Sequence, residues 1–108
     1  MLLAIDFDGV IHDYKNPVEG RRMGPPIDGA KDALKKYMVR GDEVVIFSTW
    51  ATEKGQKTIR EWLHYYHIPF SSVTNIKPNA DVYIDDKAIR FINWDEIHKY
   101  EQEKGLTN

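Results

Sequence analysis

Side chains able to act on phosphate groups or metal ions occur beside short apolar runs at four places in the chain. Carboxylates can serve as nucleophiles, as general acids or bases, and as ligands of hard cations such as Mg²⁺. Hydroxyl and ammonium groups can bind phosphate oxygens. In chain order, the residues are Asp6 and Asp8, Ser48 and Thr49, Lys77, and Asp85 and Asp86.

The apolar runs beside these residues predict four strands, at Leu2–Ile5, Val44–Phe47, Ser72–Thr74 and Val82–Ile84. All except the weak third run are continuous rather than alternating, which is typical of strands covered on both faces of a parallel sheet. In such a sheet, ligands bind outside the carboxyl ends of the strands. We therefore expect the chemical groups to meet at one edge.

Two helices are predicted between the strands from the spacing of apolar residues. The first covers about 30–38, with Asp28 as its N-terminal cap and Gly41 at its end. The second has its apolar face at 59–66 and ends before Pro69. Strands that alternate with helices favour an α/β fold.

A third helix is predicted at 94–103, where Asn93 and Glu96 resemble a capping box. The glycine- and proline-rich segment 12–27 is interpreted as a loop, with a short hairpin considered near 10–14. The whole chain, 1–108, is thus expected to form a single Rossmann-like domain. Its architecture would be a three-layer α/β sandwich with a mostly parallel sheet.

Each chemical group also has a plain structural interpretation. Asp-x-Asp-Gly and Asp-Asp after a strand are often turns, Ser-Thr is often a helix cap, and an isolated lysine is usually solvated. The convergence of all four is what favours a site. Four carboxylates at one edge would repel one another without a cation. Because the chain has no cysteine, an all-oxygen site favours Mg²⁺ over Zn²⁺.

Four motifs in this order are similar to those of the haloacid dehalogenase superfamily of phosphatases. The run Leu2-Leu3-Ala4-Ile5-Asp6-Phe7-Asp8-Gly9-Val10-Ile11 resembles its first motif. Val44-Val45-Ile46-Phe47-Ser48 resembles the second, and Lys77-Pro78 the third. Val82-Tyr83-Ile84-Asp85-Asp86 resembles the fourth, an apolar strand that ends in an acidic pair. The first and fourth are specific as a pair.

The resemblance implies a hydrolase that forms an aspartyl-phosphate. Asp6 would attack the phosphoryl group, and Asp8 would protonate the leaving oxygen and then activate water. Mg²⁺ would bind the Asp6 carboxylate, the Asp8 main-chain carbonyl and the fourth-motif acid. Asp86 is the expected direct ligand and Asp85 its support, although the choice between them stays open.

The resemblance also implies residues that bind the phosphoryl group. Ser48 would hydrogen-bond a phosphoryl oxygen, with Thr49 as the alternative, and Gly9 belongs to the same substrate-binding set. Lys77 would neutralise the charge of the nucleophile and phosphate, and Lys54 and Lys87 compete with it for that role. Trp50 next to the second motif is interpreted either as a substrate-stacking residue or as part of the core.

A cap domain, which many members of this superfamily carry, does not fit in the sequence. The first insertion point holds only the loop 12–27, and the second, 51–76, is filled by one helix and a strand. We therefore expect an open site that takes a small phosphorylated substrate, with a bulky one or a lid from a partner subunit as alternatives. His12 and Asp13 are expected to line the pocket. The basic loop residues Lys15, Arg21 and Arg22 are interpreted as solvated, with binding of a phosphorylated ligand as the alternative, and His64 and His67 as surface or core histidines.

Composition narrows the remaining classes. The 108 residues are 42% hydrophobic with a net charge of −2, which excludes a basic nucleic-acid footprint over the whole surface but not a local basic patch. No run approaches the roughly 20 apolar residues of a membrane helix, so a cytoplasmic protein without membrane contact is expected. Oligomerisation is possible through aromatic residues such as Tyr65, Tyr66 and Trp94. The alternatives are a receiver-like signalling domain, a non-catalytic phosphate-binding protein, and an enzyme for phosphorylated nucleic-acid ends or proteins.

Overall fold

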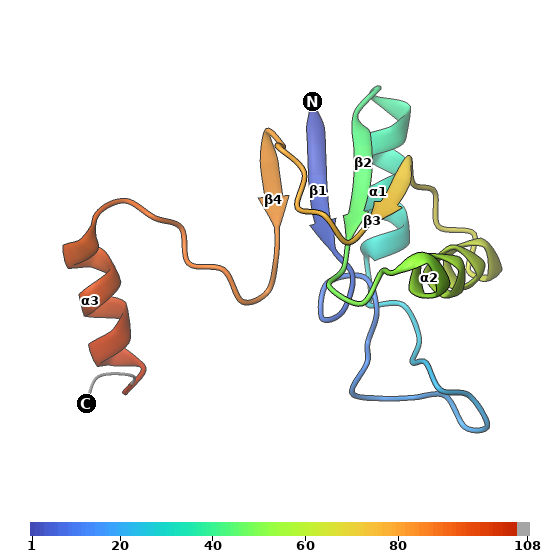
Figure 1. Ribbon diagram of the computed structural model, residues 1–108, viewed down its shortest axis with the longest axis horizontal. Coiled ribbons are helices and arrows are strands. Elements are labelled where there is room, and N and C mark those ends of the chain that lie inside the picture. Colours follow the sequence, from blue (N-terminus) through green and yellow to red (C-terminus); the bar gives the residue numbers. More distant parts are fainter. Residues whose placement is uncertain (106–108) are drawn as a thin grey trace.

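A parallel four-stranded sheet lies at the centre of the protein in the computed structural model, which describes residues 1–105 (Figure 1). The strands are β1 (Leu2–Asp6), β2 (Glu43–Phe47), β3 (Ser72–Thr74) and β4 (Val82–Ile84), in the order β3-β2-β1-β4. All pairings are parallel, so every carboxyl end lies at the same edge. The predicted α/β class and the four predicted strands are confirmed.

Among the described residues, three helices accompany the sheet: α1 (Ala30–Val39), α2 (Glu53–Tyr65) and α3 (Trp94–Glu103). The predicted cap of α3 is confirmed, since the Asn93 side chain accepts a hydrogen bond from the Glu96 amide at 2.9 Å. The predicted cap of α1 is wrong. Its N-cap is Gly29 rather than Asp28, because the chain enters the helix through a left-handed turn, with a φ of 88°. Glycine adopts that conformation without strain.

One face of the sheet carries the hydrophobic core. A row of four residues crosses all the strands in register, from Ile84 through Ile5 and Ile46 to Val73. Buried residues of α1 and α2 pack with this row, in or against one hydrophobic cluster. They include Leu34 of α1, and Ile59 and Leu63 of α2. Each fully buried side chain of this kind contributes about 1.5–3 kcal/mol to folding.

The segment 75–81 between β3 and β4 crosses the opposite face of the sheet (Figure 1). Tyr83 fixes it there: the Tyr83 hydroxyl donates to the Pro78 carbonyl at 2.6 Å and accepts from the Ala80 amide at 3.1 Å. A connection rather than a helix therefore forms the layer over β1 and β4. The cavity beneath it reaches the carboxyl edge of the sheet.

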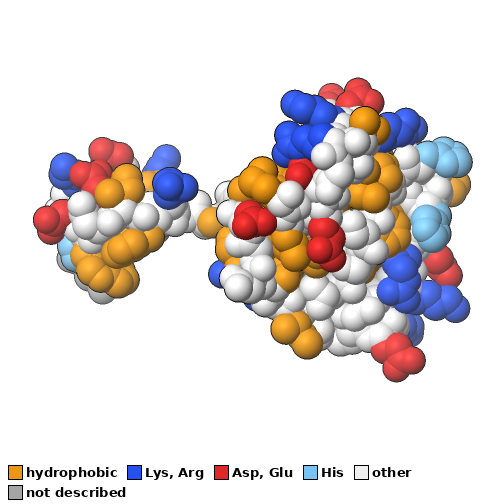
Figure 2. All heavy atoms as spheres, turned by 90° about the horizontal axis from the view of Figure 1, so that it is seen from above, with side chains coloured by type: hydrophobic (Ala, Val, Ile, Leu, Met, Phe, Trp, Pro, Cys, Tyr) orange, Lys and Arg blue, Asp and Glu red, His pale blue; other side chains and the backbone are white. Residues whose placement is uncertain are grey.

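After β4 the chain leaves the sheet and α3 stands apart from it (Figures 1 and 2). Within residues 1–105, no other helix or strand contacts α3. The radius of gyration is 15.6 Å, whereas a compact chain of this length has about 13 Å. Apolar side chains stay exposed on this arm, including Phe91 and Trp94. Over the described residues, no helix is both long and apolar enough to span a membrane.

Candidate functional site

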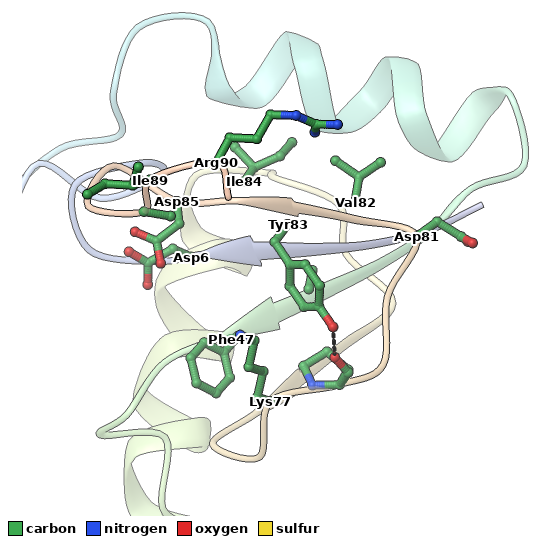
Figure 3. Close-up of a pocket in the computed structure, with 13 residues that line it drawn as sticks. Asp6, Phe47, Lys77, Asp81, Val82, Tyr83, Ile84, Asp85, Ile89 and Arg90 are labelled. Atoms are coloured by element: carbon green, nitrogen blue, oxygen red, sulfur yellow. Dashed lines mark hydrogen bonds between the residues drawn. The ribbon is translucent and has the colours of Figure 1, made fainter. Parts of the chain in front are cut away.

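The carboxyl edge of the sheet brings together most of the residues that the sequence singled out. Asp6 ends β1, Ser48 and Thr49 follow β2, and Asp85 follows β4. Two adjoining cavities open there, of about 590 and 390 Å³. Asp6 and Asp85 line both cavities. The smaller cavity adds Asp8, Ser48, Thr49 and Lys87, and the larger adds Lys77 (Figure 3).

Three carboxylates form a tight acidic cluster. Asp6, Asp85 and Asp86 each present an oxygen, and these three oxygens lie within 4.8 Å of one another. Figure 3 shows the Asp6 and Asp85 carboxylates side by side at the end of their strands. Burial, together with the negative charges of Asp85, Asp86 and Asp8, raises the pKa of Asp6 to about 6. The metal-free cluster is therefore electrostatically unfavourable at neutral pH.

The donor set of this cluster fits Mg²⁺, a hard cation bound by oxygen ligands. A cation there would offset the repulsion that raises the Asp6 pKa. Gly9 shapes the cluster from the β1 loop, because a Cβ at this position would lie 2.3 Å from Oδ2 of Asp86. A side chain at position 9 would therefore displace the Asp86 carboxylate, and the φ of +84° favours glycine there. The Asp85 carboxylate accepts a hydrogen bond from the Lys87 amide at 2.8 Å, which fixes its orientation.

Asp8 is held separately from the acidic cluster. Its Oδ1 lies 2.7 Å from Nδ1 of His12, and its Oδ2 accepts a hydrogen bond from the Trp50 indole at 2.6 Å. Trp50 is 37% exposed, and it both packs edge-on against the buried Phe7 ring, with centroids 5.9 Å apart, and reaches Asp8 with its indole. His12 was expected to line the pocket, but it is buried and lines neither cavity. Its contact with Asp8 was missed. The signal was Gly9 directly after Asp8, whose positive φ turns the chain back and brings residue 12 beside residue 8.

His12 is packed and hydrogen-bonded on every side. It is 5% exposed, its ring stacks on Phe7 with centroids 5.0 Å apart, and the edge of Trp62 packs against it. Its Nε2 accepts a hydrogen bond from the Gly24 amide at 2.9 Å. The Gly24 carbonyl in turn accepts from the Trp62 indole at 3.0 Å. The loop 12–27 is thereby tied both to α2 and to Asp8.

Three of the predicted phosphate-binding residues, Ser48, Thr49 and Lys77, line one cavity or the other, whereas Gly9 lines neither. Ser48 is 3% exposed and borders the smaller cavity beside the exposed Thr49. The Lys77 ammonium lies over the Tyr83 ring, 4.8 Å from its centroid (Figure 3). Within residues 1–105, neither Lys77 nor Lys87 lies within 4 Å of a carboxylate oxygen. Lys87 borders the same cavity as Asp8, whereas Lys54 lines neither cavity.

The rest of loop 12–27 extends from the site without a hairpin. Its described bridges link His12 to Asp8 and, in antiparallel fashion, to Pro26. Arg21 packs on the Tyr65 ring at 4.6 Å from its centroid, and donates to the Tyr65 hydroxyl at 3.1 Å. Asp13 accepts from the Asn16 side chain and lines neither cavity. His64, His67, Lys15 and Arg22 are exposed.

Comparison with known proteins supports the fold and leaves the activity open. No family model matches the chain, and no curated protein matches it. A conserved protein from Bacteroides thetaiotaomicron has a similar structure, with a TM-score of 0.65 and 26% identity. That match covers 100% of this chain and 93% of the other. A structurally characterised target protein from Vibrio cholerae matches with a TM-score of 0.54 and 24% identity, over 95% of this chain and 98% of the other.

Proposed function

We propose that the protein is a Mg²⁺-dependent phosphomonoesterase of the haloacid dehalogenase type. The observation that carries this proposal is that two carboxylates, two residues apart in the sequence, are held in different surroundings. Asp6 lies in a cluster of three acids suited to a cation, and Asp8 is turned away from that cluster toward two N–H donors. A turn alone requires neither arrangement.

The residues would act in two stages. Asp6 attacks phosphorus and forms an aspartyl-phosphate, while Asp8 gives a proton to the leaving oxygen. Asp8 then takes a proton from the water that hydrolyses this intermediate. Asp6, the Asp8 carbonyl and Asp86 would hold Mg²⁺, supported by Asp85. When bound, the ion supplies positive charge that stabilises the transferring phosphoryl group.

Phosphate contacts would come from residues that line the two cavities. Ser48 or Thr49 would donate a hydrogen bond to a phosphoryl oxygen from the end of β2. Lys77 and Lys87 are the ammonium groups that line the two cavities, and either would reach the phosphate by rotation of an exposed side chain. Residues 1–105 include no inserted domain over the edge of the sheet. The proposed substrate is therefore a small phosphomonoester, and the open edge also admits a larger one.

Release of inorganic phosphate tests the proposal. The wild-type protein is incubated with phosphorylated metabolites, nucleotides and 5′- and 3′-phosphorylated oligonucleotides, with Mg²⁺ and with a chelator. We expect many equivalents of phosphate per protein from at least one substrate, and none with the chelator. Asp6→Asn keeps the shape of the side chain, and we expect it to lower turnover by about 10³-fold or more because it removes the nucleophile.

Two results would count against the proposal. Retention of a single equivalent of phosphate on the protein without turnover would favour a receiver-like domain. Turnover by Asp6→Asn at the wild-type rate would refute the nucleophile. Thr58→Ala on the outer surface of α2 serves as the matched control, since Thr58 is exposed and lines neither cavity.

A further inference from the structure

We propose that His12 is a positioning residue that holds the Asp8 carboxylate ready for proton transfer through its Oδ2 atom. This inference rests on the proposed function, because it assigns a role to the neighbour of the proposed acid. The carrying observation is a continuous set of contacts from α2 to Asp8. It runs from the Trp62 indole to the Gly24 carbonyl, and from the Gly24 amide through both nitrogens of His12 to Asp8 Oδ1.

The contacts of His12 select one tautomer. A backbone amide can only donate, so the 2.9 Å contact with the Gly24 amide makes Nε2 the acceptor. A neutral imidazole carries its proton on the other nitrogen, so Nδ1 donates to Asp8 across 2.7 Å. The ring is locked in this orientation by Phe7 beneath it and Trp62 at its edge. The Gly24 amide therefore makes Nδ1, the nitrogen that faces Asp8, the donor of the ring.

The two oxygens of Asp8 then have different roles. Oδ1 contacts the buried side chain of His12. Oδ2 instead accepts a hydrogen bond from the indole of Trp50, a residue that is 37% exposed. Asp8 also borders the smaller cavity. Oδ2 is therefore the oxygen that a substrate can reach, once Trp50 gives up its hydrogen bond. The proton on Oδ2 passes to the leaving oxygen as its bond to phosphorus breaks and the Asp6–phosphorus bond forms.

The tautomer of His12 is measurable without any substrate. Long-range ¹H–¹⁵N NMR of the uniformly labelled protein reports which ring nitrogen carries the proton, and loss of one signal set in His12→Asn assigns residue 12 among the four histidines. We expect His12 to be protonated on Nδ1 and unprotonated on Nε2. A ring protonated on Nε2, or on both nitrogens, would overturn the proposal.

A pair of variants separates positioning from packing. His12→Phe keeps the ring but removes both nitrogens, whereas His12→Asn keeps an N–H donor near the place of Nδ1. Both variants lose the hydrogen bond with the Gly24 amide. They therefore differ mainly in whether residue 12 can donate a hydrogen bond to Asp8. Protonation of the leaving group matters more for an alkyl phosphate than for 4-nitrophenyl phosphate. We therefore expect His12→Phe to lower kcat/KM about tenfold more for the alkyl ester, and His12→Asn to recover most of that difference.

Each outcome of these measurements is decisive. An equal loss on both esters, or an equal loss in both variants, would show that His12 only supports the fold. If His12→Phe does not fold, His12→Asn and the tautomer of the wild-type protein still test the proposal. Absence of turnover by the wild-type protein would refute the proposed function and the proton-transfer step. An Nδ1-protonated ring would then still establish that His12 orients Asp8.

Discussion

The two flanks of the site differ in how their carboxylates are held. On one flank, Asp8 receives hydrogen bonds from two side chains, one of them buried. On the other flank, Asp85 and Asp86 are exposed, and the residues after them lead to α3, which contacts no other helix or strand among residues 1–105. We call these flanks the Asp8 side (Asp8, His12, Gly24, Trp50 and Trp62) and the β4 side (Asp85, Asp86 and Lys87).

This difference matches the demands of two kinds of chemistry. A group that transfers protons must keep a fixed orientation without help from a ligand, so it benefits from packed neighbours. Carboxylates that share a cation can be ordered by the cation itself, and close packing without it would add to their repulsion. The Asp8 side is thus organised in advance by the core, whereas the β4 side would complete its order when the ion binds.

The largest expected effect comes from comparing one carboxylate of each flank. Asp8→Asn removes the acid and base, so we expect kcat to fall by about 10²–10⁴-fold at any Mg²⁺ concentration. Asp86→Asn removes a proposed metal ligand, so its activity should recover as Mg²⁺ is raised. Phosphate release across a Mg²⁺ titration measures both. Recovery of Asp8→Asn at high Mg²⁺ would remove the distinction between the flanks.

A smaller effect, on stability, is expected at Gly24 of the Asp8 side. A Cβ there would lie 1.8 Å from the Asp13 carbonyl oxygen. Gly24→Ala must therefore shift the backbone at residue 24, whose amide donates a hydrogen bond to His12. We expect a loss of about 2–3 kcal/mol in the free energy of unfolding, measured in urea. Gly20→Ala is the control: it has open space but a φ of +77°, and should cost about 1 kcal/mol. Equal losses of unfolding free energy in Gly24→Ala and Gly20→Ala would mean that the close packing around Gly24 does not contribute to stability.

Much of the framework could be predicted from the sequence because it follows from local rules. Apolar runs, three of them continuous and the third weak, predicted the four strands, and the parallel arrangement of the strands placed Asp6, Ser48 and Asp85 at one edge. The Asn93 cap followed from a short-range pattern, and it is present. The cap of α1 was wrong because the left-handed turn at Gly29 replaces a side-chain cap, and a helical pattern does not distinguish the two.

Most of the Asp8 side could not be predicted because its contacts are long-range, apart from the contact between His12 and Asp8, which are four residues apart. Trp62 and Gly24 are 38 residues apart, and Trp50 and Asp8 are 42 apart. Their meeting depends on how loop 12–27 and α2 pack, which no local spacing encodes. The separation of α3 from the sheet could not be predicted either, because the amphipathic pattern of α3 predicts a helix but not what it packs against.

Mg²⁺ is expected to stabilise the fold through the acidic cluster. A ligand at about 100 times its Kd that binds only the folded state adds about 2.7 kcal/mol, which would be seen as a rise in Tm at neutral pH. The rise should shrink in Asp86→Asn and persist in His12→Asn, because His12 lies on the Asp8 side, away from the three clustered carboxylates. A rise of equal size in Asp86→Asn would contradict a metal site on the β4 side.

The smallest expected effect is the pH dependence of the metal-free protein. The pKa of Asp6 is raised from 3.8 to about 6 in the folded state, so the folded state holds a proton that the unfolded chain has lost between these values. The free energy of unfolding should therefore fall as pH rises from about 4 to about 6. Urea unfolding with a chelator measures how the free energy of unfolding changes with pH. Asp6→Asn, which cannot titrate at this position, separates the contribution of Asp6 from that of other groups.

We expect the Asp6→Asn variant to lack this decline and to exceed the wild-type protein in stability at pH 7, although it loses activity. Because burial and the charges of Asp85 and Asp86 cause the shift, saturating Mg²⁺ should also remove the decline. The same slope in Asp6→Asn as in the wild-type protein would show that the three carboxylates do not interact as closely as their positions imply.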